Sequence, residues 1–183
     1  MRRAIGIVAT IAIALGGAIA LLLWFENRDS SQVSQQAGAA ATVAGPGRLL
    51  PDQGDAHLHP GERPPKAYVS DPPASGAHVP VPVVHDATRL SDDELLHALE
   101  LGDVVLLYGG ARPPVALRTL ADKVAGPFDP ALAAAGQAVV LAQRPGTKGV
   151  IALAWRRELR TASAADPALE PFADFWLGRG APA

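Results

Sequence analysis

Histidine is the residue type with which this chain of 183 residues could do chemistry, because the sequence has no cysteine and its single methionine is residue 1. Disulfides, zinc thiolates, thiol nucleophiles and thioether ligands for Cu(I) are therefore excluded. A metal site would have to use imidazole, carboxylate or backbone oxygen. The five histidines are His57, His59, His78, His85 and His97.

Residues 95–102, LLHALELG, place His97 on a predicted helix and put Leu101 four positions later. Two histidines at this spacing would share one helix face and could hold one metal ion. With about 100° of rotation per residue, three leucines cluster on one side, whereas His97 lies near the opposite side between Glu100 and Leu101. Because both sides carry leucine, we expect a sheet to cover one side and the preceding proline-rich segment to cover the other.

The four other histidines lie in residues 54–90, a segment rich in proline and poor in periodicity. Proline lacks a backbone donor and fixes one torsion angle, so a long helix or a central strand is excluded here. An irregular segment of this length inside a compact domain is either functional or disordered. His57 and His59 are two residues apart, a spacing that in an extended strand directs both side chains to one side.

A regular pattern of secondary structure begins at Ser91. The SDDE stretch is a capping box, with Ser91 at the N-cap and Glu94 at the third helical position, and it predicts a helix that Gly102 ends. DVVLLY at residues 103–108 predicts a strand, and RPPVALRTLADKVAG at residues 112–126 predicts a second helix.

Two more strands are predicted further along the chain. AVVLAQ at residues 138–143 and GVIALAW at residues 149–155 are apolar runs of strand length. Between them, Pro145 and Gly146 suit a type II turn. The two strands are therefore predicted to form an antiparallel hairpin.

The last predicted helix lies in DPALEPFADFWLG, residues 166–178, with Asp166 as its cap and Pro167 in its first turn. Pro171 predicts that this helix starts late or is kinked. The order helix, strand, helix, strand, strand, helix predicts an α+β or α/β layered domain. We expect a small mixed sheet with a C-terminal antiparallel hairpin and about three helices.

Residues 4–25 form an apolar run without a charged side chain. At about 1.5 Å per residue the run spans roughly 33 Å, enough for a hydrocarbon core of about 30 Å. Arg2 and Arg3 precede it, so the positive-inside rule leaves residues 1–3 in the cytoplasm. We expect a single-pass protein of the plasma (inner) membrane, in which residues 54–183 form an extracytoplasmic domain.

A cleaved signal peptide is the alternative to a transmembrane anchor. Its apolar region usually has about 7 to 15 residues and ends at a small-x-small site, which here lies well beyond the run. We therefore favour an uncleaved anchor. Residues 26–53 have few large apolar side chains and no aromatic one, so we expect a flexible tether between the membrane and the domain.

Several stretches together resemble the bacterial domain-of-unknown-function family 3105: DQGDAHLHPGE, YVSDPPASGAH and LLHALELGDVVLLY, followed by VIALAW and a terminal GRGAP. The resemblance covers residues 50–183 and implies an N-terminal anchor with an extracytoplasmic domain. Family members carry G-x-x-H, P-P-T-S-G-P-H and H-x-L-E-H-G stretches. Their histidines fall on His57, His78 and His97, while the final histidine of the last stretch falls on Leu101.

These histidines would bind a transition metal if the proline-rich segment brings His57 and His78 to His97. Three imidazoles with an open position suit Zn²⁺, Cu²⁺ or Ni²⁺, and the general order of affinities favours copper. His59 or Glu100 could supply a fourth ligand. We therefore predict metal handling or sensing, with copper or zinc as the metal, and no catalytic residue.

Two other functions stay open. A non-metal interaction module would present a surface to another envelope protein, with the histidines packed and hydrogen-bonded as structural residues. A metal-dependent enzyme would use the open coordination position, but Leu101 in place of a ligand and the lack of an evident general base argue against it. The net charge of -2 provides no strong field for nucleic acid, which we do not expect as a partner.

Other polar groups offer less chemistry. Ser75, His78 and Asp71 could form a Ser-His-Asp triad, but they are too close in sequence to assume its geometry. The remaining candidates are expected on the surface, the arginines as a solvated strand end: His85, Arg156, Arg157 and Arg160.

Overall fold

The structure is a computed structural model that describes residues 44–182. The apolar run at residues 4–25 and most of the expected tether lie outside the described residues. Within the described part of the chain, no helix is long and apolar enough to cross a membrane.

A mixed sheet of five strands forms the centre of the described domain, in the order β1-β5-β4-β2-β3. Strands β2 and β3 are parallel, and the other neighbours are antiparallel. This confirms the small mixed sheet expected from the sequence. The strands are β1 Arg48–Leu49, β2 Val104–Tyr108, β3 Val139–Gln143, β4 Val150–Ala154 and β5 Arg157–Thr161.

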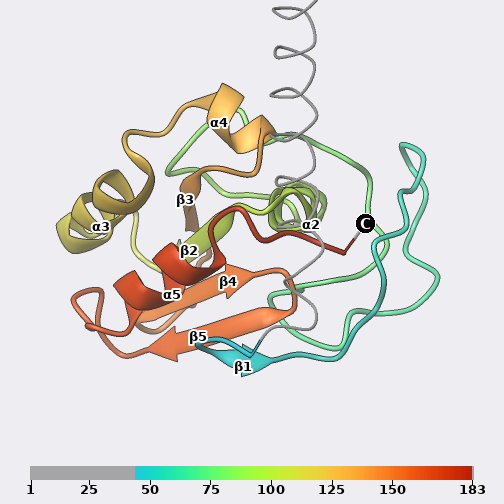
Figure 1. Ribbon diagram of the computed structural model, residues 1–183. Helices are drawn as coiled ribbons and strands as arrows, with labels where there is room; N and C mark the ends of the chain where they lie inside the picture. The colour runs from blue at the N-terminus through green and yellow to red at the C-terminus, as the bar shows by residue number, and fades with distance from the viewer. Residues whose placement is uncertain (1–43, 183) are drawn as a thin grey trace, which may run out of the picture. The chain divides into compact units, whose positions relative to one another are not determined.

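Helices cover both faces of this sheet, which confirms an α+β layered domain (Figure 1). Helices α3 and α5 pack on one face, and α2 packs on the other face, with α4 beside it. The bounds are α2 Asp92–Leu101, α3 Val115–Ala125, α4 Pro130–Ala134 and α5 Leu169–Trp176. The described residues thus hold one helix more than the three expected. The additional helix is α4, which is too short to show helical periodicity in the sequence.

The predicted hairpin between residues 138–143 and 149–155 is wrong, because β2 lies between β3 and β4. The chain leaving β3 crosses the end of β2, where the Arg144 N–H donates to the Tyr108 carbonyl over 2.9 Å. Every side chain of β2 is buried, so this strand needs a hydrogen-bonded neighbour on each edge and a layer on each face. The C-terminal hairpin is formed by β4 and β5, with Arg156 in its turn at a φ of 59°.

Strand β5 was missed because its sequence, RELRT, is strongly charged. Arg157 and Glu158 are nevertheless only 6% and 3% exposed. The expectation that Arg157 lies at a solvated strand end is therefore wrong. The Arg157 guanidinium lies over the Trp176 ring, 4.7 Å from its centroid. Arg48 and Arg160 both pair with the Glu158 carboxylate at 2.7 Å.

The folded region begins before the boundary expected at residue 53. Arg48 pairs with Glu158 across β1 and β5, and the buried Leu50 donates its N–H to the Arg156 carbonyl over 2.8 Å. Residues 48–50 are therefore folded against β5 and the turn before it. Strand β1 has only two residues, too few for an alternating side-chain pattern, and backbone hydrogen bonds hold it.

The last helix starts late, as Pro171 predicted. Helix α5 begins at Leu169 with Ala168 as its N-cap, and Pro171 lies in its first turn. Asp166 is not the cap; its carboxylate accepts the Ala168 N–H over 2.9 Å in the turn before the helix.

Helix α2 has the start, the end and the double cover that its sequence predicted. Ser91 and Glu94 form the reciprocal capping box, and Gly102 ends the helix at a φ of 120°. Three leucines, Leu95, Leu96 and Leu99, are buried in the core on the sheet side. The opposite side meets the irregular segment, whose residues contact His97 and Glu100.

Candidate metal centre

The outward side of α2 supplies two polar groups one helical turn apart. His97 Nδ1 lies 3.3 Å from Glu100 Oε2, a hydrogen bond that the i, i+3 spacing permits. Both side chains are partly buried, at 16% and 17% exposure. Helical geometry thus presents an imidazole and a carboxylate together.

The irregular segment brings His57 and His78 side by side, although they are far apart in sequence. Leu58 N–H donates to the His78 carbonyl over 2.8 Å, and His78 N–H donates to the Ala56 carbonyl over 3.1 Å. These bonds form a parallel β-bridge between the two histidines. The ring centroids of His57 and His78 are consequently 5.4 Å apart.

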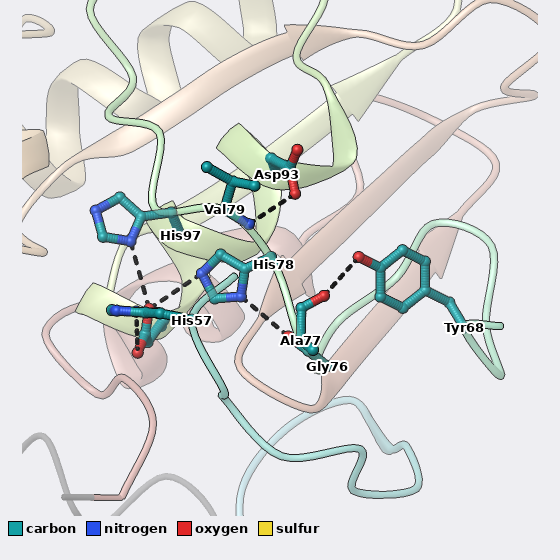
Figure 2. Close-up of polar contacts among 9 residues, drawn as sticks. His57, Tyr68, Gly76, Ala77, His78, Val79, Asp93 and His97 are labelled. Atoms are coloured by element: carbon teal, nitrogen blue, oxygen red, sulfur yellow. Dashed lines mark hydrogen bonds and ion pairs between the residues drawn. The ribbon is translucent and has the colours of Figure 1, made fainter. Parts of the chain in front are cut away.

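The three histidines converge on the Glu100 carboxylate. Figure 2 shows His57, His78 and His97 side by side, with dashed lines from all three to one carboxylate. His57 Nε2 lies 2.9 Å and His78 Nε2 lies 3.1 Å from Glu100 Oε2. One ligand atom from each of the four residues lies within 4.8 Å of every other. The fold therefore builds a compact cluster of three imidazoles and one carboxylate from the predicted residues.

His78 is the most firmly oriented member of this cluster. Its side chain is fully buried, and its Nδ1 lies 3.0 Å from the Gly76 carbonyl, which can only accept a hydrogen bond. Nδ1 must therefore carry a proton, so Nε2 faces Glu100 with a second proton in the charged ring and with a lone pair in the neutral ring. This Nε2 lies 3.1 Å from Glu100 Oε2 as an ion pair, but without the geometry of a hydrogen bond. A buried imidazole nitrogen that is oriented through the other ring nitrogen and faces a carboxylate fits a metal ligand.

Backbone contacts fix the chain on both sides of His78. The Tyr68 hydroxyl donates to the Ala77 carbonyl over 2.9 Å, and the Val79 N–H donates to Asp93 Oδ1 over 2.9 Å (Figure 2). Gly76 has a φ of 132°, and a Cβ there would lie 2.9 Å from the Tyr68 ring. Glycine is therefore required where the chain turns to offer its carbonyl to His78.

The charges of the cluster support one another. Burial by itself would raise the pKa of Glu100, but the neighbouring histidines hold that pKa well below its usual range. Burial by itself would lower the pKa of His78, but the contacts with Glu100 and the Gly76 carbonyl raise it above its ordinary value. Glu100 is therefore an ionised carboxylate. It favours a positive charge beside it, carried by a protonated histidine or by a metal ion.

A shallow hollow of about 360 Å³ gives solvent access to one side of the cluster. The His57 side chain is half exposed beside it. Leu101 lies on this side too, where the family pattern has a histidine, and is only partly buried. The hollow is lined by Asp55, His57, His97, Glu100, Leu101, Ala181 and Pro182.

Two of the histidines lie outside the cluster, and only His59 of these was a candidate ligand. His59 is exposed, and its N–H donates to Glu62 Oε2 over 2.7 Å, so Glu100 and not His59 completes the set of four. His85 is exposed, as expected.

The Ser-His-Asp arrangement is not assembled. Ser75 Oγ lies 3.3 Å from the Pro51 carbonyl, Asp71 pairs with Arg144, and His78 faces Glu100 instead. The sequence did not indicate that the Gly76 carbonyl contacts the His78 ring. It also did not indicate that Ala181 and Pro182 line the hollow beside the histidines. The GRGAP stretch was the only sequence signal for the last two.

The described part of the chain is thus an α+β domain with a histidine-glutamate cluster between one helix and an irregular cover. The sequence model of a family described as "protein of unknown function (DUF3105)" matches residues 59–182, and the chain belongs to this family. The match contains His78, His97 and Glu100 and begins just after His57. Neither the curated proteins nor the solved structures contained a match to this chain.

Proposed function

We propose that this domain binds one divalent transition metal ion through His57, His78, His97 and Glu100. The observation that supports the proposal is the convergence of four donor atoms within 4.8 Å, one of them the buried Nε2 of His78. Cooperating imidazoles with a carboxylate form a donor set common in transition-metal sites.

The donor chemistry favours Cu²⁺ or Zn²⁺. Imidazole suits both ions, and the general order of affinities places copper first. Bonds of about 2.0 to 2.1 Å to a tetrahedral ion would bring the donor atoms to about 3.3 Å from one another. The cluster must therefore contract on binding, and the half-exposed His57 is the ligand with most room to move.

The role that we assign is metal handling or sensing rather than catalysis. Glu100 as fourth ligand would fill the coordination position that a catalytic zinc ion keeps open. If residues 4–25 form the expected anchor, the domain would bind its ion on the extracytoplasmic side of the plasma membrane. An envelope protein that receives the ion, or responds to its binding, would be the partner.

Calorimetric titration of the full-length chain with Zn²⁺ alone and with Cu²⁺ alone tests the proposal. We expect uptake of one ion per chain, lost when His57, His78 and His97 are all replaced by alanine. The double variant His59→Ala, His85→Ala is the matched control, because both of these histidines are exposed and outside the cluster. Absence of uptake, or equal loss in the control, would refute the proposal.

A non-metal interaction module is the competing function. It is favoured by the ion pairs of Glu100 with all three histidines. Such a network would stabilise the cover of α2 without an ion. Crosslinking in the native membrane separates the two functions. A recurrent envelope partner that is captured equally with and without a chelator would support the module.

A further inference from the structure

The C-terminal tail, defined here as residues 178–182, is attached to the end of α2. Gly178 N–H donates to the Gly102 carbonyl, and Ala181 N–H donates to the Glu100 carbonyl, each over 2.9 Å. The last carbonyls of a helix have no partner within it. The tail supplies that partner at the very residue whose side chain completes the histidine cluster.

Close backbone contact makes this attachment specific. A Cβ added at Gly180 would overlap the carbonyl oxygen of Glu100, so only glycine allows the tail to lie there. The contact is therefore between two main chains, and a side chain at this position would separate them.

The same tail forms one wall of the hollow beside the cluster. Ala181 and Pro182 line it together with His57 and His97. In Figure 1 the red chain after α5 runs across α2 and ends beside the turquoise and green irregular segment. The tail thus lies against both parts of the chain that supply the histidines.

We propose that the C-terminal tail positions Glu100 for the metal, and that docking of the tail and metal binding promote each other; this rests on the metal-binding function proposed above. With the tail undocked, the Glu100 carbonyl loses its partner and the last turn of α2 frays. The Glu100 side chain, 17% exposed in the docked state, then gains solvent. A metal ion that needs this carboxylate binds the docked state better.

This coupling provides an output for a metal sensor. Linkage requires that an ion which binds more tightly when the tail is docked also shifts the tail toward docking. The tail is not a strand of the sheet; backbone bonds to the end of α2 and the buried Ala181 hold it, so its docking can respond while the strand pairing stays intact. A partner protein could then read metal binding from the position of the tail.

Hydrogen-deuterium exchange of the unmodified full-length chain tests the coupling directly. We expect Zn²⁺ to slow exchange at the Gly178 and Ala181 amides, whose acceptors are the carbonyls of the C-cap Gly102 and of Glu100 in the last turn of α2. The Gly126 amide, which donates to the Asp122 carbonyl at the end of α3, is the matched control and should not change. Equal exchange at the tail amides with and without bound Zn²⁺ would overturn the coupling.

Glycine substitution provides the reciprocal measurement. Gly180→Ala should weaken Zn²⁺ binding about tenfold, the lower end of the effect expected for losing a group that orients a metal ligand. Gly110→Ala is the control, because a Cβ there would lie 3.5 Å from its nearest neighbour, the Arg112 carbonyl oxygen. If the Gly180 variant fails to fold, exchange in the unmodified chain still decides the matter.

The outcomes separate the two proposals. Unchanged Zn²⁺ affinity in a folded Gly180→Ala variant refutes the role of the tail and leaves the metal site intact. No Zn²⁺ or Cu²⁺ uptake by the unmodified chain refutes the metal site, and the role of the tail with it.

Discussion

Two regions at the C-terminal end of α2 shift the pKa of a carboxyl group in opposite directions. On the outer side, Glu100 is surrounded by three histidines, and its pKa is held well below its usual range despite burial. At the inner junction with β2, Asp103 is 1% exposed, and burial raises its pKa to about 8. Asp103 Oδ1 accepts the Ala138 N–H over 2.8 Å, but Oδ2 has no hydrogen-bond partner among the described residues.

The comparison shows that partners, not burial, decide whether a carboxyl group in this domain is charged. One backbone hydrogen bond does not compensate for the desolvation of Asp103, whereas three imidazoles do so for Glu100. The region around Glu100 thus favours an ionised carboxylate. The region around Asp103 favours a neutral carboxyl group. Asp103 connects the end of α2 to the residue before β3 through its hydrogen bond with the Ala138 N–H.

The largest effect is expected from Asp103→Asn, measured by urea unfolding between pH 5 and pH 9. The folded pKa of Asp103 is raised from 3.8 to about 8, so stability is fully present below the unfolded value and is lost as the pH rises to the folded value. Within this window the slope is about 1.4 kcal/mol per pH unit. The variant should lose this slope, because asparagine does not ionise.

Asp129→Asn is the control for this experiment. Asp129 is an exposed N-cap of α4, where asparagine caps equally well. The slope should persist in this control. A slope that also persists in Asp103→Asn would show that Asp103 is not the buried acid responsible.

Glu100→Gln should weaken Zn²⁺ binding by about 10- to 100-fold, because an amide keeps the shape of the side chain but supplies no negative charge. Calorimetry of the full-length chain measures the change. Glu170→Gln removes an exposed carboxylate that pairs with Lys123, and its Zn²⁺ affinity should equal that of the unmodified chain. Equal affinity in both variants would remove Glu100 from the site.

Leu101→His should strengthen Cu²⁺ or Zn²⁺ binding, by about tenfold if the new imidazole acts as an additional ligand on the face of His97. Leu101 lines the same hollow as His97 and is only partly buried, so the substitution is accommodated. Leu101→Gln is the matched control for lost packing. If the histidine variant binds no more tightly than the glutamine variant, a side chain at position 101 does not reach the metal.

The smallest effect is expected at the exposed ion pair between Lys123 and Glu170. The two side chains are 64% and 47% exposed, so solvent screens their attraction. Lys123→Ala should change the free energy of unfolding by about 0.5 kcal/mol or less. A loss above 1 kcal/mol, measured by urea unfolding at low and high salt, would contradict the view that only buried carboxyl groups matter here.

Local signals in the sequence were read correctly where they act over one or two helical turns. The capping box located the start of α2, Gly102 located its end, and Pro171 delayed the start of α5. Strand pairing was read wrongly, because the hairpin assigned to residues 138–155 involves a third strand from elsewhere in the chain. Strand β5 escaped notice because the partners of its charged side chains, Arg48 and Trp176, are distant in sequence.

The sequence alone determined the chemistry available to the site. Without cysteine, only imidazole and carboxylate offered strong side-chain ligands, and helical spacing placed His97 and Glu100 on one face of α2. The resemblance also selected His57 and His78, whose blocks match the family pattern.

Only the tertiary structure decided which of the candidates meet. A parallel bridge joins His57 to His78, the Gly76 carbonyl orients His78, and the C-terminal tail binds the Glu100 carbonyl. Each of these contacts is made by irregular backbone, whose hydrogen bonds leave no periodic pattern in the side chains. The identity of the donors is therefore a local property of this chain, whereas their convergence depends on how its distant segments close around α2.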